Sequence, residues 1–529
     1  MYWGRLSITA LLFIVLMICW DPISSHAALN LDSNGGEGSG SNDPEDFVVQ
    51  SNLDVSDTFF VFLPSVMSWP TSAYQCDHII GQKVSTADAR TNYYKVKPGD
   101  TVCIEGGSRG GLRLRNFQGT FQDPITFVNF QGQVVISSST GDGILIQNSR
   151  YFRLTGSGTD GVDYGIKIVR SPDIGVNVGY RSSNFEIDHV EVTGTAGSGI
   201  MAKTRAVCSD GSSNDYDYDG DGVKGGDPDD VVNRDTFTQF DSTFHDNYIH
   251  NVGMEGYYIG SPRYLDGREL SCVRGTEVTY DPVLVGVYLY DNIIADTGWD
   301  GLQIGSAVED CGVYQNQISR DSQADIRYQQ SGIMLNAGSV CNVYANFIKD
   351  GGGPGMYIQG SGGDLVYNNV IVNAGQNKPV GNNNGDAISI HDGSDPGNSL
   401  YVFNNTIVKP QNFGIKFSSG RGSDSRIQNN IIIDPGNYEV NGPDAYVQTR
   451  GYTDVVVTNN FTSQVLADAR FSDPAADDFS IQWNSPAVDA GAHPEPGVVT
   501  TDYLGRIRPQ GLRYDVGAYE CRREFPLRP

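Results

Sequence analysis

The sequence predicts an all-β protein folded as a single-stranded right-handed parallel β-helix, a solenoid in which each coil stacks on the one before. A short phrase recurs between residues 286 and 435, in which an aromatic or aliphatic residue precedes a polar residue, an asparagine and β-branched residues. A repeat of roughly 20–50 residues indicates a solenoid. The repeats are rich in Ile, Val, Tyr and Phe, with Gly, Asn and Asp at the turns, and none has a helical pattern. The repeated asparagines are spaced 24, 30, 23, 36 and 25 residues apart, at Asn292, Asn316, Asn346, Asn369, Asn405 and Asn430.

The repeated asparagine is interpreted as scaffold. We expect it at the sharp bend between two strands, because asparagine tolerates the left-handed backbone conformation there. Stacked coils place successive side chains about 4.8 Å apart, which is close enough for their amides to form a hydrogen-bonded ladder. The repeat therefore predicts the fold and leaves the chemistry open.

Length and charge limit the function. A chain of 529 residues is too long for one compact core, but a solenoid escapes that limit because each coil packs only on its neighbours. The formal net charge of −27 argues against nucleic acid as a partner. It also counts mildly against an anionic polymer, which could bind only where positive charge gathers locally. We expect a monomer.

The first 91 residues are predicted to lie outside the β-helix. Residues 1–27 resemble a secretory signal, with Arg5 ahead of an apolar stretch and a small-residue cleavage site at Ser25-His26-Ala27. Residues 28–50 have the composition of a flexible linker, and residues 51–91 are assigned to an N-terminal capping segment. Because no other stretch is apolar enough to span a membrane, we expect secretion to the extracellular space or periplasm without membrane insertion.

The β-helix is expected from residue 92 to 465, with a C-terminal capping segment at 466–529 that covers the exposed end of the solenoid. Its opening, Pro98-Gly99-Asp100 into a strand and then Pro124-Ile125-Thr126-Phe127-Val128, resembles the first coils of the pectin-lyase-like superfamily. Within that superfamily it is similar to alginate lyase and chondroitinase B relatives. The resemblance implies a secreted polysaccharide-degrading enzyme, but it carries no catalytic residue over, because no catalytic motif of these families is found.

Two insertions are expected to leave the coils, and six cysteines are candidates for disulfides. Insertions near 204–236 and 261–284 leave the coil pattern, and in a solenoid such insertions often wall a binding site. Export permits disulfides. The pairs Cys76–Cys103 and Cys208–Cys272 are plausible by proximity, and Cys311 and Cys341 open adjacent coils and could bond, although sequence alone does not fix the connectivity.

A second repeat predicts the candidate site. Each coil has a glycine followed by a strand in which the first and third residues are apolar, so the second and fourth should face outward. Stacking gives one surface whose amides, hydroxyls, aromatic rings and charges suit a polysaccharide, with an ordinary solvated face as the alternative. Its members are Lys203, Tyr258, Gln303, Asn336, Tyr357, Gln359, Ser389, His391 and Lys416, with Glu255, Asp300 and Asp386 along one edge.

Two chemistries fit this surface. In β-elimination the candidate bases or neutralising groups are Lys203, Tyr258, His391 and Lys416, with Glu255 and Asp300 holding Ca²⁺. In hydrolysis the paired carboxylates come from Glu255, Asp300 and Asp386. Elimination ranks first by analogy with the relatives, hydrolysis second, and a non-catalytic carbohydrate-binding or adhesin solenoid third. Substrate binding is assigned to Gln303, Asn336, Tyr357, Gln359 and Asp386.

A second candidate for Ca²⁺ lies in the first insertion, where Asp215, Asp217, Asp219 and Asp221 alternate with Tyr and Gly. Alternating carboxylates with glycine at the turn suit a hard cation. The twelfth position is Gly226 or Pro228, so the loop is not an EF-hand. The alternative is a solvated acidic loop.

Overall fold

The computed structural model describes residues 74–521 apart from 214–215, 361, 377, 379–383, 392–397, 421–423, 452–453 and 495–496. The predicted signal and linker, and residues 51–73 of the predicted N-terminal segment, lie outside this part of the chain. Residues 71–529 form one compact unit. Within the described residues, no helix is both long and apolar enough to cross a membrane.

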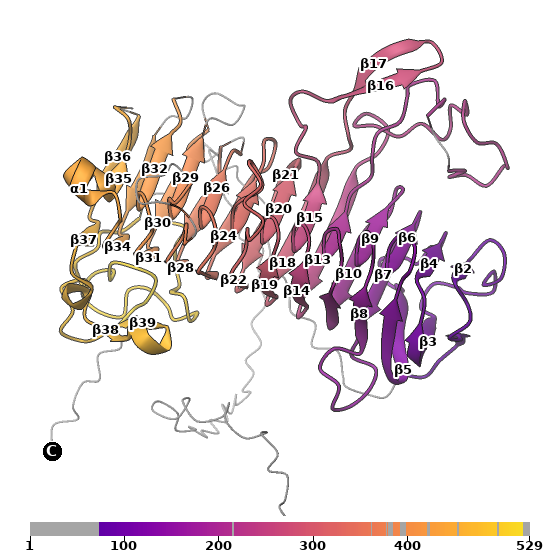
Figure 1. The fold of residues 1–529 in the computed structure, drawn as a ribbon, viewed down its shortest axis with the longest axis horizontal. Coiled ribbons are helices and arrows are strands. Elements are labelled where there is room, and N and C mark those ends of the chain that lie inside the picture. The colour runs from indigo at the N-terminus through magenta and orange to yellow at the C-terminus, as the bar shows by residue number, and fades with distance from the viewer. Residues whose placement is uncertain are drawn as a thin grey trace, which may run out of the picture. The chain divides into compact units, whose positions relative to one another are not determined.

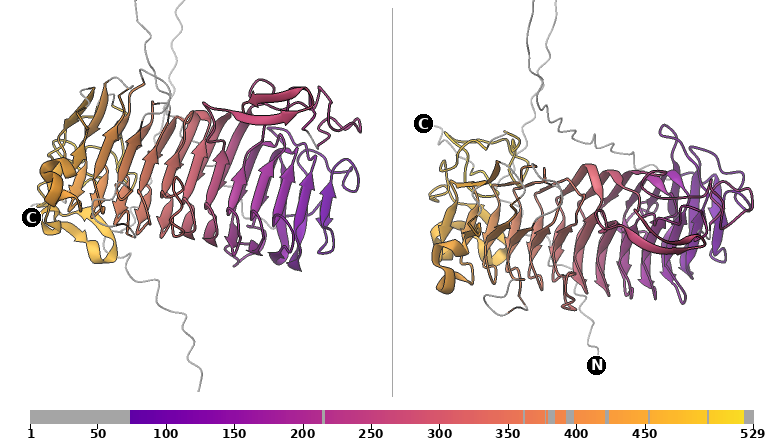
Figure 2. Two further views of the ribbon diagram at one scale, coloured as in Figure 1. Left: turned by 45° about the horizontal axis from the view of Figure 1, so that its top comes forward. Right: turned by 90° about the horizontal axis from the view of Figure 1, so that it is seen from above.

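Two long parallel sheets follow the axis of the molecule, and their strands stack side by side in every view (Figures 1 and 2). The predicted parallel β-helix is therefore confirmed. Sheet B has 12 strands: β2 (Thr86–Asp88), β4 (Leu112–Arg115), β6 (Ile144–Gln147), β9 (Val176–Gly179), β12 (Ile200–Ala202), β15 (Tyr257–Gly260), β20 (Leu302–Gly305), β23 (Ile333–Leu335), β26 (Met356–Ile358), β29 (Ile388–His391), β32 (Ile415–Ser418) and β35 (Val447–Gln448).

Sheet A has 23 strands in two parallel rows, so each coil contributes to it twice. Its strands are β1 (His78–Ile80), β3 (Thr101–Arg109), β5 (Ile125–Ser137), β7 (Arg150–Thr155), β8 (Ile166–Arg170), β10 (Ser183–Asp188), β11 (Val190–Thr193), β13 (Gln239–His245), β14 (Tyr248–Val252), β18 (Leu284–Tyr290), β19 (Ile293–Thr297), β21 (Ala307–Tyr314), β22 (Gln317–Ser319), β24 (Cys341–Tyr344), β25 (Phe347–Lys349), β27 (Leu365–Tyr367), β28 (Val370–Val372), β30 (Tyr401–Phe403), β31 (Thr406–Val408), β33 (Ser425–Gln428), β34 (Ile431–Ile433), β36 (Val455–Thr458) and β37 (Phe461–Ser463).

The asparagine ladder forms inside the solenoid. Each Asn Nδ2 donates to the Asn Oδ1 of the next coil at 2.9–3.2 Å, from Asn247 through Asn292, Asn316, Asn346, Asn369, Asn405 and Asn430 to Asn460. The expectation that these asparagines adopt the left-handed conformation is wrong.

The left-handed residue is the one before each ladder asparagine, as at Asp291 (φ 53°), Ala345 (φ 53°) and Asn368 (φ 54°). That residue turns the chain, so that the following amide points along the core and reaches its partner. Even an alanine accepts the strained backbone at position 345, because the hydrogen-bonded ladder and the flanking strands hold it there.

The two insertions leave the coils where predicted. The first lies between β12 and β13, and the second contains the antiparallel hairpin of β16 (Arg268–Cys272) and β17 (Gly275–Thr279). Both project beyond the sheets near the N-terminal coils (Figure 1). Cys208–Cys272 joins the two insertions, and Cys76–Cys103 and Cys311–Cys341 also form. All three suggested pairings are therefore present.

The first coil begins within the segment assigned to residues 51–91, since β1 pairs with β3 and β2 pairs with β4. At the other end, the segment after β37 packs on the outer side of β28, β31 and β34 through a second apolar cluster. It covers a flank of the last coils. The remaining elements are α1 (Tyr438–Asn441), η1 (Gly442–Ala445), η2 (Leu466–Ala469), η3 (Pro474–Ala476), β38 (Phe471–Asp473) and β39 (Asp478–Ile481).

Candidate functional site

The register of sheet B places the predicted residues in one row. The second position after each glycine pairs from strand to strand, and the first and third positions, such as Ile259 and Ile304, are fully buried. Each strand therefore has the predicted alternation of core-facing and outward-facing side chains. The row runs through Met201, Tyr258, Gln303, Met334, Tyr357, Ser389 and Lys416.

The candidate residues separate into two clusters along this row. The first cluster contains Lys203, Glu255, Tyr258, Asp300 and Gln303, and it lies around β12, β15 and β20. The second cluster contains Tyr357, Asp386, Ser389, His391 and Lys416, around β26, β29 and β32. Four strand spacings separate β15 from β29 in sheet B, or about 19 Å at 4.8 Å per spacing. One reaction centre cannot include both clusters.

Lys203 is the most perturbed cation of the first cluster. Its Nζ lies 3.5 Å from the centroid of the Tyr258 ring, and the side chain is only 8% exposed. Burial and the nearby Arg205 lower the pKa of Lys203 to about 7, against opposing contributions from Asp281 and Glu255. A lysine with this pKa is about half neutral at pH 7, so its amine can accept a proton.

Glu255 and Asp300 form a buried pair of carboxyl groups beside Lys203. Ser198 Oγ donates to Glu255 Oε2 at 2.7 Å, and the Ser331 amide donates to Asp300 Oδ1 at 2.6 Å. Burial raises the pKa of both carboxyl groups, and the negative charge of Glu255 raises that of Asp300 further. A cation between them would favour the ionised forms.

Gln329 joins the first cluster, although no repeat in the sequence points to it. Three acceptor oxygens surround one end of its side-chain amide, so that end is assigned as the nitrogen; the nitrogen then donates to Asp300 Oδ2 at 2.8 Å and to Glu255 Oε1 at 3.2 Å, and it lies 3.3 Å from Gln303 Oε1. The two carboxylate oxygens are therefore at most 6.0 Å apart, the sum of 2.8 and 3.2 Å. Three oxygens surround one point at which a positively polarised group sits, and oxygen ligands of this kind suit Ca²⁺.

The second cluster is held together by its own contacts. The His391 ring stacks on Tyr357 with centroids 4.7 Å apart, and Ser389 Oγ lies 3.1 Å from His391 Nε2. Lys416 Nζ lies 3.8 Å from Asp386 Oδ2. Burial raises the pKa of Asp386 to about 6, against the opposing charge of Lys416. Buried to this degree, Lys416 and Asp386 have the character of a structural ion pair.

The expected open surface is largely covered, which corrects that part of the prediction. Gln303, Ser389 and Lys416 are buried, and Asn336 is buried with its side-chain amide 3.4 Å from the Ile304 carbonyl. Gln359, Tyr357, Tyr258 and His391 are half-buried. Over Gln303 the cover comes from the loop after β22, whose Gln329 side chain reaches Gln303 Oε1.

This loop is tied to the segment before β29. Asn384 Nδ2 donates to Gln330 Oε1 at 2.8 Å, and Lys378 forms an ion pair with Asp325. Strand alternation predicts which side chains leave the core, but it does not predict which loops fold back over them.

The acidic loop of the first insertion brings carboxylates together as expected. Asp217, Asp219 and Asp230 form one group with oxygens within 4.8 Å of one another, and Asp219, Asp221 and Asp227 form a second. Asp215 lies outside the described residues. The Asp217 carboxylate accepts the amides of Gly220 (2.5 Å) and Gly222 (3.1 Å).

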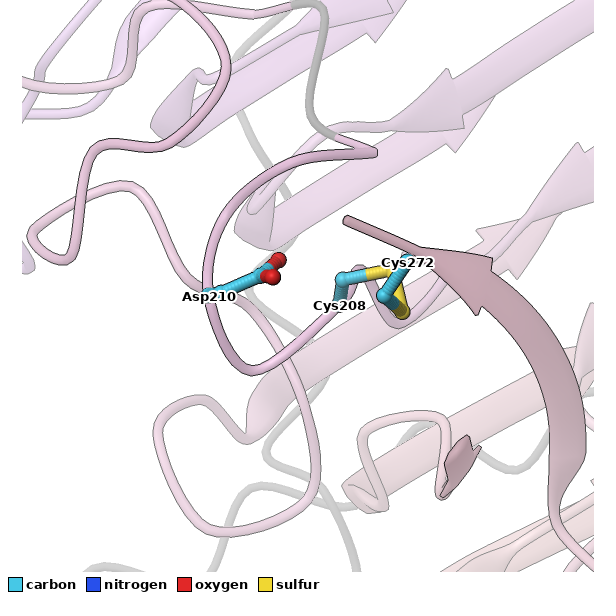
Figure 3. A group of neighbouring side chains, drawn as sticks. All are labelled: Cys208, Asp210 and Cys272. Atoms are coloured by element: carbon cyan, nitrogen blue, oxygen red, sulfur yellow. A yellow bond between two sulfur atoms is a disulfide. The ribbon is translucent and has the colours of Figure 1, made fainter. Parts of the chain in front are cut away.

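Two other clusters of ligand-type side chains are explained without a metal. Cys208, Asp210 and Cys272 lie together (Figure 3), but the two sulfurs are joined in a disulfide and are not thiolate ligands. On sheet A, Asp188 accepts a 2.7 Å hydrogen bond from Arg153, which also lies 3.0 Å from Glu186. The guanidinium therefore already supplies the positive charge between these carboxylates.

Residues 243–432 match the family model described as a right handed beta helix region, which is less than half of the chain. Together with the two parallel sheets, this match shows that the fold is a right-handed parallel β-helix. No curated protein matches the chain.

Three solved structures illustrate the range of similar proteins. Pectate lyase Pel9A is 13% identical, with 86% of this chain and 98% of that chain covered and a TM-score of 0.39. The PL6 family alginate lyase AlyGC is 12% identical, with 73% of this chain and 51% of that chain covered and a TM-score of 0.39. This chain therefore spans about half the length of that protein. The GH136 lacto-N-biosidase from Eubacterium ramulus is 12% identical, with 73% of this chain and 68% of that chain covered and a TM-score of 0.41. None of the three assigns an activity to this chain.

Proposed function

We propose that the protein is a secreted polysaccharide lyase that cleaves a uronic-acid-containing glycan by β-elimination at the first cluster. The observation that carries the proposal is Lys203, a buried lysine whose pKa is lowered to about 7 and whose amine lies against Tyr258. Strongly shifted pKa values of this kind occur preferentially at functional sites. The three disulfides accord with an oxidising, extracytoplasmic location.

In this proposal Lys203 Nζ removes the proton beside the uronate carboxylate. The C–H electron pair becomes the new C=C bond, and the glycosidic C–O bond breaks. The leaving oxygen takes a proton from the Tyr258 hydroxyl, and the protonated lysine then returns a proton to the phenolate. Burial and the charge of Glu255 raise the pKa of Tyr258 to about 12, so the phenol is protonated when the reaction begins.

Positive charge gathers near this cluster despite the net charge of −27. Arg205 is exposed next to Lys203, and Arg205 and Arg268 are both close enough to lower the pKa of Lys203. We assign Arg205 the role of pairing with the uronate carboxylate, because a guanidinium matches a carboxylate bidentately.

We propose that Ca²⁺ binds to Glu255, Asp300 and Gln303, at the point where the Gln329 amide now contacts all three oxygens. Bound there, the ion would neutralise the uronate carboxylate and so acidify the neighbouring proton. A second Ca²⁺ is assigned to Asp217, Asp219 and Asp230 in the acidic loop, whose oxygens lie within 4.8 Å of one another, as a structural ion that would stiffen the insertion.

The test incubates the full chain, with and without Ca²⁺, with polygalacturonate, alginate and chondroitin sulfate, and measures the ultraviolet absorbance of the unsaturated product. We expect product from one of the three and a loss of at least about 100-fold in Lys203→Ala and Tyr258→Phe, in line with removal of a general acid or base. Lys95→Ala and Tyr94→Phe are the matched controls, because this pair forms an exposed cation–π contact of 5.8 Å. Equal losses in the controls, or full activity in Lys203→Ala, would contradict the assignment.

Glycoside hydrolysis is the second candidate, favoured by the closeness of Glu255 and Asp300 and by the raised pKa of both. A retaining hydrolase places its two carboxyl groups about 5–5.5 Å apart, which the limit of 6.0 Å set by Gln329 allows. New reducing ends without the unsaturated product, lost in Glu255→Gln but kept in Lys203→Ala, would select hydrolysis. Binding to a glycan without either product would select the non-catalytic alternative.

A further inference from the structure

A pocket with three arginines lies among the N-terminal coils, outside both clusters. It has a volume of about 260 Å³ and is lined by Arg90, Arg150 and Arg181 together with Tyr218. Three side-chain amides complete the lining, those of Asn116, Gln118 and Asn148. Among the described residues that line this arginine pocket none carries a carboxylate, and the Asp217 carboxylate lies 3.9 Å from Arg90 at its edge.

Aromatic rings of the first insertion position two of the arginines. The Arg150 guanidinium lies 5.7 Å from the centroid of the Phe237 ring, and that of Arg181 lies 5.0 Å from the centroid of the Tyr218 ring. Among the described residues neither arginine has an ion-pair partner, and Arg181 Nε is buried without a hydrogen-bond acceptor. Stacking fixes a guanidinium while leaving its N–H donors for a ligand.

Arg90 is the arginine that the fold already uses. Its Nη1 donates to the Asp217 carbonyl at 2.9 Å, its Nη2 bonds the Tyr218 carbonyl, and the Asp217 carboxylate lies 3.9 Å from it. Burial and the positive charge of Arg181 lower the pKa of Arg150. Two like charges held close together in a partly buried pocket would be relieved by a bound anion.

The arginine pocket lies in line with Lys203 along sheet B. Arg90, Asn116, Asn148 and Arg181 follow the ends of β2, β4, β6 and β9, and Lys203 follows β12, the next strand after β9. The amide of Arg181 also donates to Thr204 Oγ1 at 3.0 Å. The pocket therefore begins about 5 Å from the coil of Lys203 and extends to about 19 Å, at 4.8 Å per strand.

We propose that the arginine pocket binds an anionic substituent, a carboxylate or a sulfate, on a sugar of the glycan chain away from the bond that is cleaved. This inference rests on the proposed function and adds to it that the substrate must carry negative charge on at least two sugars. The guanidinium groups of Arg150 and Arg181 supply the donors that an oxyanion accepts. Arg90 and the three side-chain amides already donate to protein acceptors and shape the pocket around them.

Calorimetric titration of the full chain tests the proposal, in a Lys203→Ala background that prevents turnover. The probes are hexasaccharides of galacturonate, of alginate and of chondroitin sulfate, a neutral xylohexaose, and inorganic sulfate. In Arg150→Gln/Arg181→Gln we expect the affinity for the best acidic hexasaccharide to fall about 100-fold, roughly tenfold for each charged contact removed. The control Arg170→Gln, an exposed arginine on β8, should change it less than about twofold. The preferred hexasaccharide distinguishes carboxylate from sulfate.

Equal affinities in the double variant and the control would overturn the proposal, as would the absence of binding by every acidic probe and by sulfate. If the double variant fails to fold by circular dichroism, Arg181→Lys replaces it, since it keeps the charge and loses the planar fork. Competition by inorganic sulfate for hexasaccharide binding then gives a readout without a further variant.

The two proposals fail separately. If acidic hexasaccharides bind through the pocket but the Lys203-containing chain forms no unsaturated product, the lyase proposal is contradicted and the anion site is supported. If the pocket variant that retains Lys203 forms unsaturated product with the same KM as the wild-type chain, the lyase proposal is supported and the anion site is contradicted.

Discussion

Replacing Lys203 with methionine should stabilise the protein at neutral pH. The fold buries the Lys203 amine, and burial disfavours its charged form. Burial, the largest cause, and Arg205 lower the pKa of Lys203 from 10.5 to about 7. Methionine has a similar unbranched shape and carries no charge. The Lys203→Met protein therefore keeps most of the packing and removes the desolvation cost.

The size of the effect follows from the shift of 10.5 − 7 = 3.5 in the pKa of Lys203. At 1.36 kcal/mol per pKa unit this is about 4–5 kcal/mol, an upper estimate of the penalty. Below pH 7 the folded and unfolded chains both bind the proton, and the penalty is complete. Between pH 7 and 10.5 only the unfolded chain binds it, so the free energy of unfolding rises with pH and the penalty disappears near pH 10.5.

Guanidinium denaturation of wild type and Lys203→Met at several pH values from 6 to 10 measures this difference directly. We expect the variant to be more stable by about 4 kcal/mol at pH 6–7, with the gap closing toward pH 10. Lys95→Met, which changes an exposed lysine, should show no such trend. A difference in the free energy of unfolding that is absent, or that stays constant with pH, would contradict the burial of Lys203 and its lowered pKa. Because the assay requires no substrate, it is independent of the proposed activity.

Three further changes test other parts of the structure. Arg205→Gln removes a nearby cation and should raise the pKa of Lys203 toward its ordinary value, which a pH–rate profile would record as a shift of its acidic limb to higher pH; an unmoved limb would contradict the influence of Arg205 on Lys203. Asn346→Ala breaks the ladder and leaves buried donors without partners, and should destabilise the fold by about 2–3 kcal/mol in denaturant unfolding, while Asn342→Ala, exposed on the same coil, should have little effect. Replacing both cysteines of the Cys311–Cys341 disulfide, 30 residues apart, with serine should cost about 3 kcal/mol, and unchanged unfolding would show that the bridge contributes nothing.

The repeat made most of the fold predictable. A solenoid applies the same local rules in every coil, so the spacing of the ladder asparagines and of the coil glycines was sufficient to align strands that the structure pairs in register. The same alignment identified Tyr258 and Gln303 as neighbours on one face. It also located both insertions, because they interrupt the period.

What the sequence did not provide lies in the segments that have no period. Gln329 comes from the loop after β22, and its contact with Glu255 and Asp300 depends on how that loop folds back over the sheet. The burial of Lys416 beside Asp386 depends in the same way on cover from elsewhere. The division into two clusters follows from counting strands between β15 and β29, which requires the completed sheet.

The net charge of −27 appeared to disfavour an anionic substrate, and the structure explains why a whole-chain sum misleads in this fold. Each coil packs only on its neighbours, so a group of coils can carry outward arginines without disturbing the acidic coils farther along the axis. At 0.15 M salt, charges more than about 8 Å apart through solvent are largely screened. An anion at Arg150 or Lys203 therefore experiences the charges of its own coils far more strongly than the distant carboxylates. For a solenoid, the charge that bears on a ligand is the charge of the few coils it touches, and residues 138–205, which carry Arg150 and Lys203, hold seven basic and seven acidic side chains, so these coils do not share the strong negative charge of the whole chain.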